Sequence, residues 1–153
     1  MTVRVQHADF DVGLEIRRLR DGRPRIGAVV SFIGTVRDLN DGLGVNTLTL
    51  EHYPGMTERS LQDICDQARS RWSLEDLLII HRVGELAPLD QIVLVVTASA
   101  HRGEAFAACE FIMDFLKTRA PFWKKERTPQ GDRWVEARDS DTSAAARWSA
   151  PDT

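Results

Sequence analysis

The order of apolar patterns along this 153-residue chain predicts an α+β domain with a largely antiparallel sheet. Strand-like segments follow one another at short spacing, which favours pairing between sequence neighbours. Two longer segments carry apolar residues at helical spacing, and two short β-rich segments near the C-terminus flank a turn. We therefore expect a single domain over residues 1–153, with two main helices and a C-terminal hairpin.

The N-terminal part of the chain predicts a strand, a short helix and a longer strand. Val3 to Val5 is a candidate edge strand, and Asp9 or Asp11 is expected to cap an amphipathic helix. Residues 26–36 are rich in β-formers and predict a long strand. Gly34 interrupts this strand, which indicates a bulge or a close approach of another backbone segment.

The middle of the chain predicts a strand, a main helix and a meander. Residues 45–53 alternate between apolar and polar side chains, as expected for a strand with one buried face. Thr57 is expected to cap the first main helix. The apolar face of that helix carries Leu61, Ile64, Cys65, Ala68 and Trp72. The apolar runs at 77–81 and 91–98 predict two strands of a meander.

The second main helix is expected to begin near Arg102. It must end before Pro121, because proline lacks an amide hydrogen and disfavours helix at the residue before it. Its expected apolar stripe comprises Phe106, Cys109, Ile112 or Met113, and Leu116. Residues 123–127 and 133–137 predict the hairpin, and the chain beyond Arg138 is expected to form a last helix or to fray.

Composition and spacing argue against several functional classes. The net charge of −3 is unlike that of a non-specific nucleic-acid binder, and no apolar run approaches the roughly 20 residues of a membrane span. The N-terminal residues lack the apolar core of a signal peptide, so we expect a cytoplasmic location. The four histidines show no metal-ligand spacing, and neither a metal nor a cofactor is expected. Cys65 and Cys109 are expected to be buried, reduced thiols.

Cationic residues gather at the ends of predicted elements. His101 and Arg102 lie where the strand at 91–98 meets the second main helix, so they combine positive side chains with free helix N–H groups. They predict an anion site, although the alternative of two solvated side chains stays open. Arg37 follows the long strand and is either a second clamp for a phosphate or carboxylate, or a solvated loop arginine.

Three lysines are candidates for chemistry. Lys117 is expected in the last turn of the second main helix, where the helix dipole alone favours a lysine. Among neighbouring cations it is also a candidate acid, base or nucleophile. Lys124 and Lys125 lie on the following strand, whose successive side chains face opposite ways. One of these two is therefore expected to face the site and the other the solvent.

Five ordered blocks of the chain carry a family resemblance. They are Phe32–Asp38, Leu50–Met56, His81–Leu86, Ser99–Arg102 and Lys117–Lys124, and Gly131–Arg138 adds to them. Together they closely resemble the large, catalytic subunit of molybdopterin synthase, from about Gly27 to Trp148.

This resemblance implies an α/β hammerhead fold and a homodimer of catalytic subunits within a heterotetramer. Each catalytic subunit would bind a small ubiquitin-like sulfur-carrier subunit, whose C-terminal Gly-Gly ends in a thiocarboxylate. The substrate would be cyclic pyranopterin monophosphate, and insertion of two sulfurs would give the dithiolene of molybdopterin. From the composition and spacing described above, we expect no nucleic acid, no membrane and no metal as partners.

Carried over by position, the resemblance makes Lys117 the principal catalytic residue and Lys124 its catalytic neighbour. The implied substrate-binding residues are Thr35, Val36, Arg37, His101, Arg102, Lys117, Lys124, Lys125, Glu126 and Arg138. Arg37, His101 and Arg102 would converge on the substrate's phosphate. The resemblance also suggests that one site draws residues from both subunits of the dimer.

Two other functional classes remain as alternatives. A non-catalytic adaptor would bind a ubiquitin-like tail and an anionic ligand without turning them over. A metal-dependent hydrolase would retain a tightly bound metal on purification. An assay with thiocarboxylated small subunit and precursor separates the enzyme from the adaptor.

Overall fold

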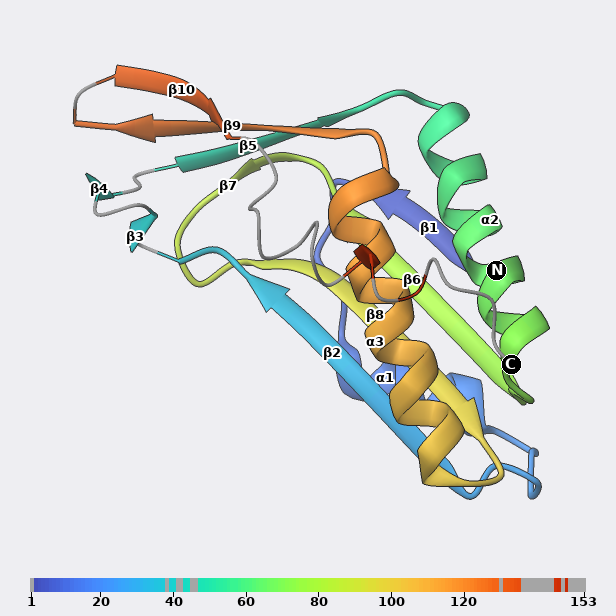
Figure 1. Cartoon of the computed structure of the whole chain (residues 1–153). Helices are drawn as coiled ribbons and strands as arrows, with labels where there is room; N and C mark the ends of the chain where they lie inside the picture. The colour runs from blue at the N-terminus through green and yellow to red at the C-terminus, as the bar shows by residue number, and fades with distance from the viewer. Residues whose placement is uncertain are drawn as a thin grey trace.

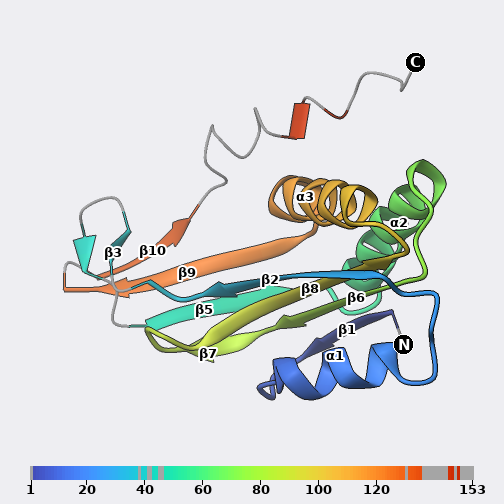
Figure 2. The same cartoon turned by 90° about the horizontal axis from the view of Figure 1, so that it is seen from below.

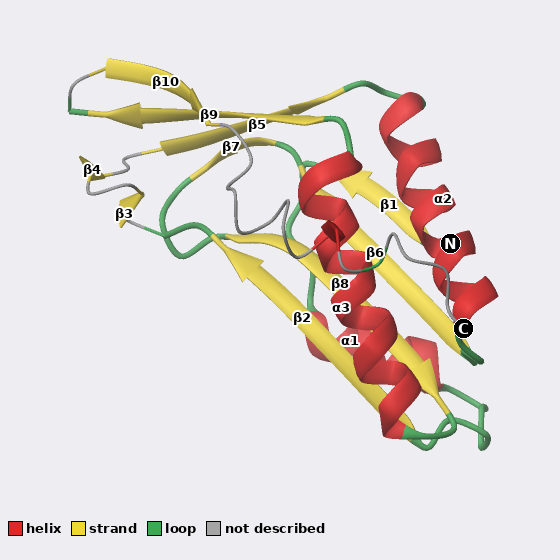
Figure 3. Ribbon diagram, in the orientation of Figure 1, coloured by secondary structure: helices red, strands yellow, loops and turns green. Residues whose placement is uncertain are grey.

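The computed structural model describes residues 2–37, 39–40, 43–44, 47–129, 131–135, 145–146 and 148. Within them the chain forms two four-stranded sheets, a two-stranded ribbon and three main helices (Figure 1). Figure 3, coloured by secondary structure, shows the helices gathered around one sheet while the other sheet extends away from them. The predicted α+β class is confirmed.

The first sheet has the strand order β1-β6-β8-β2. Its strands are β1 (Val3–Gln6), β6 (Asp76–Arg82), β8 (Gln91–Ser99) and β2 (Ala28–Thr35). β6 pairs antiparallel with β8, and β8 with β2, whereas β1 joins β6 in parallel. The meander of β6 and β8 and the edge position of β1 are therefore confirmed. β2 forms the other edge of this sheet.

The second sheet has the order β10-β9-β5-β7 and is antiparallel throughout. Its strands are β10 (Gly131–Val135), β9 (Phe122–Thr128), β5 (Thr47–His52) and β7 (Gly84–Leu86). The predicted hairpin is confirmed as β9 and β10. β7 was not predicted, because a three-residue strand that begins with a glycine shows no usable periodicity. A small ribbon pairs β3 (Leu39–Asn40) with β4 (Leu43–Gly44).

Helices cover both faces of the first sheet. Figure 2 shows α1 (Val12–Arg20) on one face, with α2 (Met56–Arg71) and α3 (Arg102–Arg119) on the other. Asp9 and Asp11 were the two expected caps for α1. The N-cap is Asp11, whose side chain accepts a 3.0 Å hydrogen bond from the Leu14 N–H. None of the described helices is both long and apolar enough to cross a membrane.

Two expectations about the main helices were wrong. Thr57 does not cap α2, because the N-cap is Gly55, and the Glu58 carboxylate accepts the Gly55 N–H at 2.7 Å. Phe106 does not belong to the buried stripe of α3, since its side chain is 60% exposed. The apolar face of α3 is formed instead by residues that include Ala105, Cys109, Ile112 and Leu116.

The main core lies between the first sheet and helices α2 and α3. Cys65 and Cys109 are both buried free thiols within it, as expected. Burial raises the pKa of the Cys65 thiol to about 12 and that of Cys109 to about 11, which keeps both protonated. The bulge expected at Gly34 is confirmed by a register shift before Thr35. A Cβ at Gly34 would lie only 2.8 Å from Val93 Cγ1, so the strands meet closely there.

Candidate functional site

The two candidate catalytic lysines lie on either side of the turn that joins α3 to β9. Lys117 is exposed in the last turn of α3, and Lys124 is half-buried on β9. Between them, α3 ends at Arg119 with Ala120 as its C-cap, and Pro121 follows. Both lysine charges contribute to lowering the pKa of one buried imidazole, that of His81.

The face of β9 that carries Lys124 also carries Phe122 and Glu126, since alternate residues share a face. Phe122 is opposite His52 on β5, and Glu126 is buried. Leu50 and Leu48 on β5 are buried and lie in register with Lys124 and Glu126, so this face of the second sheet carries both apolar and polar side chains.

Lys125 lies on the opposite face of the same strand. It pairs in register with Thr49 and Trp134, and its Nζ lies 5.8 Å from the centre of the Trp134 ring. The expectation that Lys124 and Lys125 face opposite ways is confirmed. Within one chain the structure therefore groups Glu126 with Lys124 but not Lys125.

His81, for which the sequence predicts no role, also belongs to this region. It is 3% exposed, and its ring stacks on the Phe122 ring with centroids 3.8 Å apart and planes 17° from parallel. Its Nδ1 lies 2.8 Å from the backbone oxygen of Arg82. Because a carbonyl only accepts, Nδ1 carries the hydrogen and donates it.

Burial is the main cause that lowers the pKa of His81, to about 3. The charges of Lys124, Lys117 and His52 lower it further, whereas the hydrogen bond to Arg82 opposes the shift. The imidazole is therefore neutral near neutral pH. A signal for this site existed in the sequence, because His81 opens one of the resemblance blocks, but neither its burial nor its ring partner could be read from it.

His101 and Arg102 lie at the far end of α3. Both are exposed, and His101 is the N-cap of the helix, with no side-chain capping bond of its own. At 1.5 Å per residue, the helix separates Arg102 from Lys117 by roughly 22 Å along its axis. The helix begins at Arg102, as expected, so its first backbone N–H groups lie beside these two cations.

Arg37 is exposed and lies beyond the opposite end of the first sheet from His101. The register of β2 with β8 pairs Ala28 with Ser99 and Thr35 with Gln91, so the strand spans roughly 23 Å between those pairs. Arg37 follows the end of β2, and Figure 1 shows that β2 and α3 both run toward the second sheet. Within one chain, Arg37 does not converge with His101 and Arg102 on one anion.

The remaining expected residues have mixed positions. Thr35 is exposed at the end of β2, and Val36 is buried in a small cluster with Leu48 and Leu86. Arg138 lies outside the described residues. No group of three or more His, Cys, Asp or Glu side chains within the described ranges is arranged to hold a metal ion.

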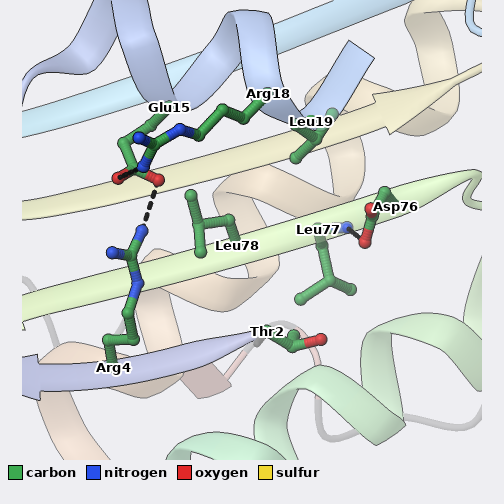
Figure 4. A pocket seen from close by; sticks show the side chains of 8 residues that line it. All are labelled: Thr2, Arg4, Glu15, Arg18, Leu19, Asp76, Leu77 and Leu78. Atoms are coloured by element: carbon green, nitrogen blue, oxygen red, sulfur yellow. Dashed lines mark hydrogen bonds and ion pairs between the residues drawn. The ribbon is translucent and has the colours of Figure 1, made fainter. Parts of the chain in front are cut away.

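A separate hollow of about 490 Å³ lies on the α1 side of the first sheet. Figure 4 shows Arg4 and Arg18 directed toward Glu15 across it, and Arg4 forms an ion pair with Glu15. Its basic side chains are thus already matched by an acidic one. None of the expected site residues lines this hollow.

Known proteins resemble this chain over nearly its whole length. The family model described as "MoaE protein" matches residues 5–119. The molybdopterin synthase catalytic subunit of Ralstonia nicotianae is 69% identical over 147 residues, covering 96% of this chain and 84% of that protein. The Escherichia coli protein of the same name is 61% identical over 91% of this chain and 92% of its own length.

A solved structure confirms the likeness of fold. The molybdopterin biosynthesis MoaE protein from Burkholderia ambifaria superposes with a TM-score of 0.84 and 56% sequence identity. The match covers 98% of this chain and 99% of that one.

Proposed function

The chain belongs to the MoaE family of molybdopterin synthase catalytic subunits, and from this premise we propose how its residues transfer sulfur. It is a sulfurtransferase of molybdenum cofactor biosynthesis. Its partner is the small ubiquitin-like subunit that carries a C-terminal thiocarboxylate, and its substrate is cyclic pyranopterin monophosphate. We further propose that it acts in the cytoplasm, which fractionation of cells would test.

One observation supports the catalytic assignment most strongly. Lys117 and Lys124 lie on either side of the turn after α3, and both charges lower the pKa of the neutral, buried His81. In the proposed reaction the thiocarboxylate sulfur bonds to a side-chain carbon of the pterin while that carbon's bond to an oxygen breaks, so that the oxygen departs. Water then cleaves the acyl–sulfur bond, which leaves sulfur on the pterin and a carboxylate on the small subunit. Lys117 exchanges protons with the departing oxygen, and Lys124 stabilises the negative charge that develops.

The open edge of β2 supports a route by which two chains complete one site. Phe32 and Ile33 are 38% and 37% exposed on this edge, and an exposed apolar edge strand favours pairing with another strand. Antiparallel pairing of two β2 strands about an axis near Phe32 would bring Arg37 beside the partner's Gly27, which donates to its own Ser99 carbonyl. In this arrangement Arg37 and Lys117 of one chain meet His101 and Arg102 of the other.

Mutation of Lys117 tests the catalytic part of the proposal. Lys117→Ala is expected to abolish conversion of precursor to molybdopterin while the fold and binding of the small subunit persist. Lys117→Arg should fail almost as badly, because a guanidinium does not release its proton near neutral pH. Lys124→Ala is expected to be impaired less completely. Binding without turnover by the unmodified protein would instead identify an adaptor.

Mixed dimers test whether the site is shared. A Lys117→Ala chain and an Arg102→Ala chain should each be poorly active as homodimers. In the mixed dimer, one site keeps both wild-type residues and the other loses both. After random exchange of subunits, about a quarter of wild-type activity should return. No recovery in dimers shown to be mixed would mean that each site is built from a single chain.

A further inference from the structure

Two residues from other parts of the fold contact the turn between Lys117 and Lys124. Thr57, fully buried on α2, donates its hydroxyl to the Pro121 carbonyl at 3.1 Å and accepts the Tyr53 N–H at 3.0 Å. His81, from the end of β6, stacks on Phe122 immediately after that proline. The turn is therefore tied to α2 by a hydrogen bond and to the first sheet by a ring contact.

The ring contact joins the two sheets at the point where the site is built. His81 is on the same face of β6 as Ile79, which lies in the main core beneath α2 and α3. Phe122 is the first residue of β9 and shares a face with Lys124 two positions later. A shift or rotation of Phe122 would therefore be passed along the strand to Lys124.

The orientation of the His81 ring is itself fixed. Its Nδ1–H donates to the Arg82 carbonyl, so the plane in which Phe122 stacks is set by the backbone at the end of β6. The ring is also neutral, which matters because a buried cation at this position would repel Lys117 and Lys124.

We propose that His81 is a positioning residue for sulfur transfer: its ring, oriented by the Arg82 carbonyl and stacked on Phe122, sets the placement of Lys124 relative to Lys117. This role rests on the proposed catalytic assignment of the two lysines. His81 does not touch the substrate, and it acts only through the start of β9.

The experiment compares ring-keeping and ring-removing variants in the complete synthase with thiocarboxylated small subunit. His81→Leu removes the aromatic ring and should lower kcat roughly 10- to 100-fold, with little change in the KM for precursor, because only alignment of the reacting groups is lost. His81→Phe keeps a ring over Phe122 and should restore kcat close to the wild-type value. His81→Asn, which keeps a donor for the Arg82 carbonyl without the ring, should resemble His81→Leu.

Ile79→Ala serves as the matched control, because Ile79 is buried on the same strand and face but is not the residue stacked on Phe122. It should lower the melting temperature while kcat per folded enzyme stays unchanged. In the wild type, the imidazole nitrogen shifts in an NMR spectrum should identify the neutral tautomer with hydrogen on Nδ1.

Two results would overturn the proposal. One is a folded His81→Leu enzyme whose kcat matches that of Ile79→Ala. The other is a His81→Phe enzyme as slow as His81→Leu or, if the leucine variant does not fold, as slow as His81→Asn. Failure of the catalytic assignment would look different, since Lys117→Ala would then retain activity whatever the His81 variants do.

Discussion

The buried neutral imidazole of His81 should make the protein sensitive to mild acid. Its pKa is lowered from an ordinary value of 6.5 to about 3, chiefly by burial. Below about pH 6.5 the unfolded chain therefore binds a proton that the folded chain does not. Since folding must exclude that proton, this contribution to stability is complete above the unfolded pKa and is lost as the pH falls toward 3.

The loss amounts to about 1.4 kcal/mol per pH unit below the unfolded pKa, or about 2 kcal/mol by pH 5. Urea unfolding of wild type and His81→Phe at about pH 7 and about pH 5 measures it, at one fixed protein concentration because dimerisation also stabilises. The variant should lose about 2 kcal/mol less than the wild type between the two pH values. Any constant effect of the substitution cancels in this comparison. Equal losses in the two proteins would refute a neutral His81 in the folded state.

Further predictions concern packing and thiol chemistry. Gly27→Ala should lower the free energy of unfolding by about 1–3 kcal/mol, because the new Cβ would lie 2.2 Å from the Ala100 carbonyl oxygen. Gly103→Ala, in open space on α3, is the matched control and should be neutral or stabilising by up to about 1 kcal/mol; a reversed order in urea midpoints would contradict this packing. Cys65 and Cys109 should resist alkylation by iodoacetamide at about pH 8 until urea unfolds the chain, and rapid mass shifts in the native protein would show that they are accessible.

Local patterns predicted most of the elements, because each depends on side chains close together in sequence. The helix ending before Pro121 and the bulge at Gly34 follow from backbone chemistry that acts within one or two residues. The buried position of Phe106 was predicted wrongly, because periodicity alone allows more than one face of a helix and only the packed sheet selects between them.

The arrangement of the site required the tertiary fold. Nothing near His81 in the sequence indicates that its ring will stack on Phe122, because two strands and a helix separate the two residues along the chain. The separation of Arg37 from Arg102 likewise depends on the antiparallel register of β2 with β8. Residue types predict an anion site, whereas the ends of the molecule at which Arg37 and Arg102 lie could not be read from local spacing.

The turn between α3 and β9 also restricts how this protein can evolve. One residue inserted into α3 before Lys117 would rotate that lysine by about 100° around the helix axis. One residue inserted into β9 before Lys124 would move that lysine to the other face of the sheet. With the turn tied to Thr57 and His81, neither change can be absorbed locally. Lineages can exchange side chains in this segment, but we expect its length to be inherited without gain or loss.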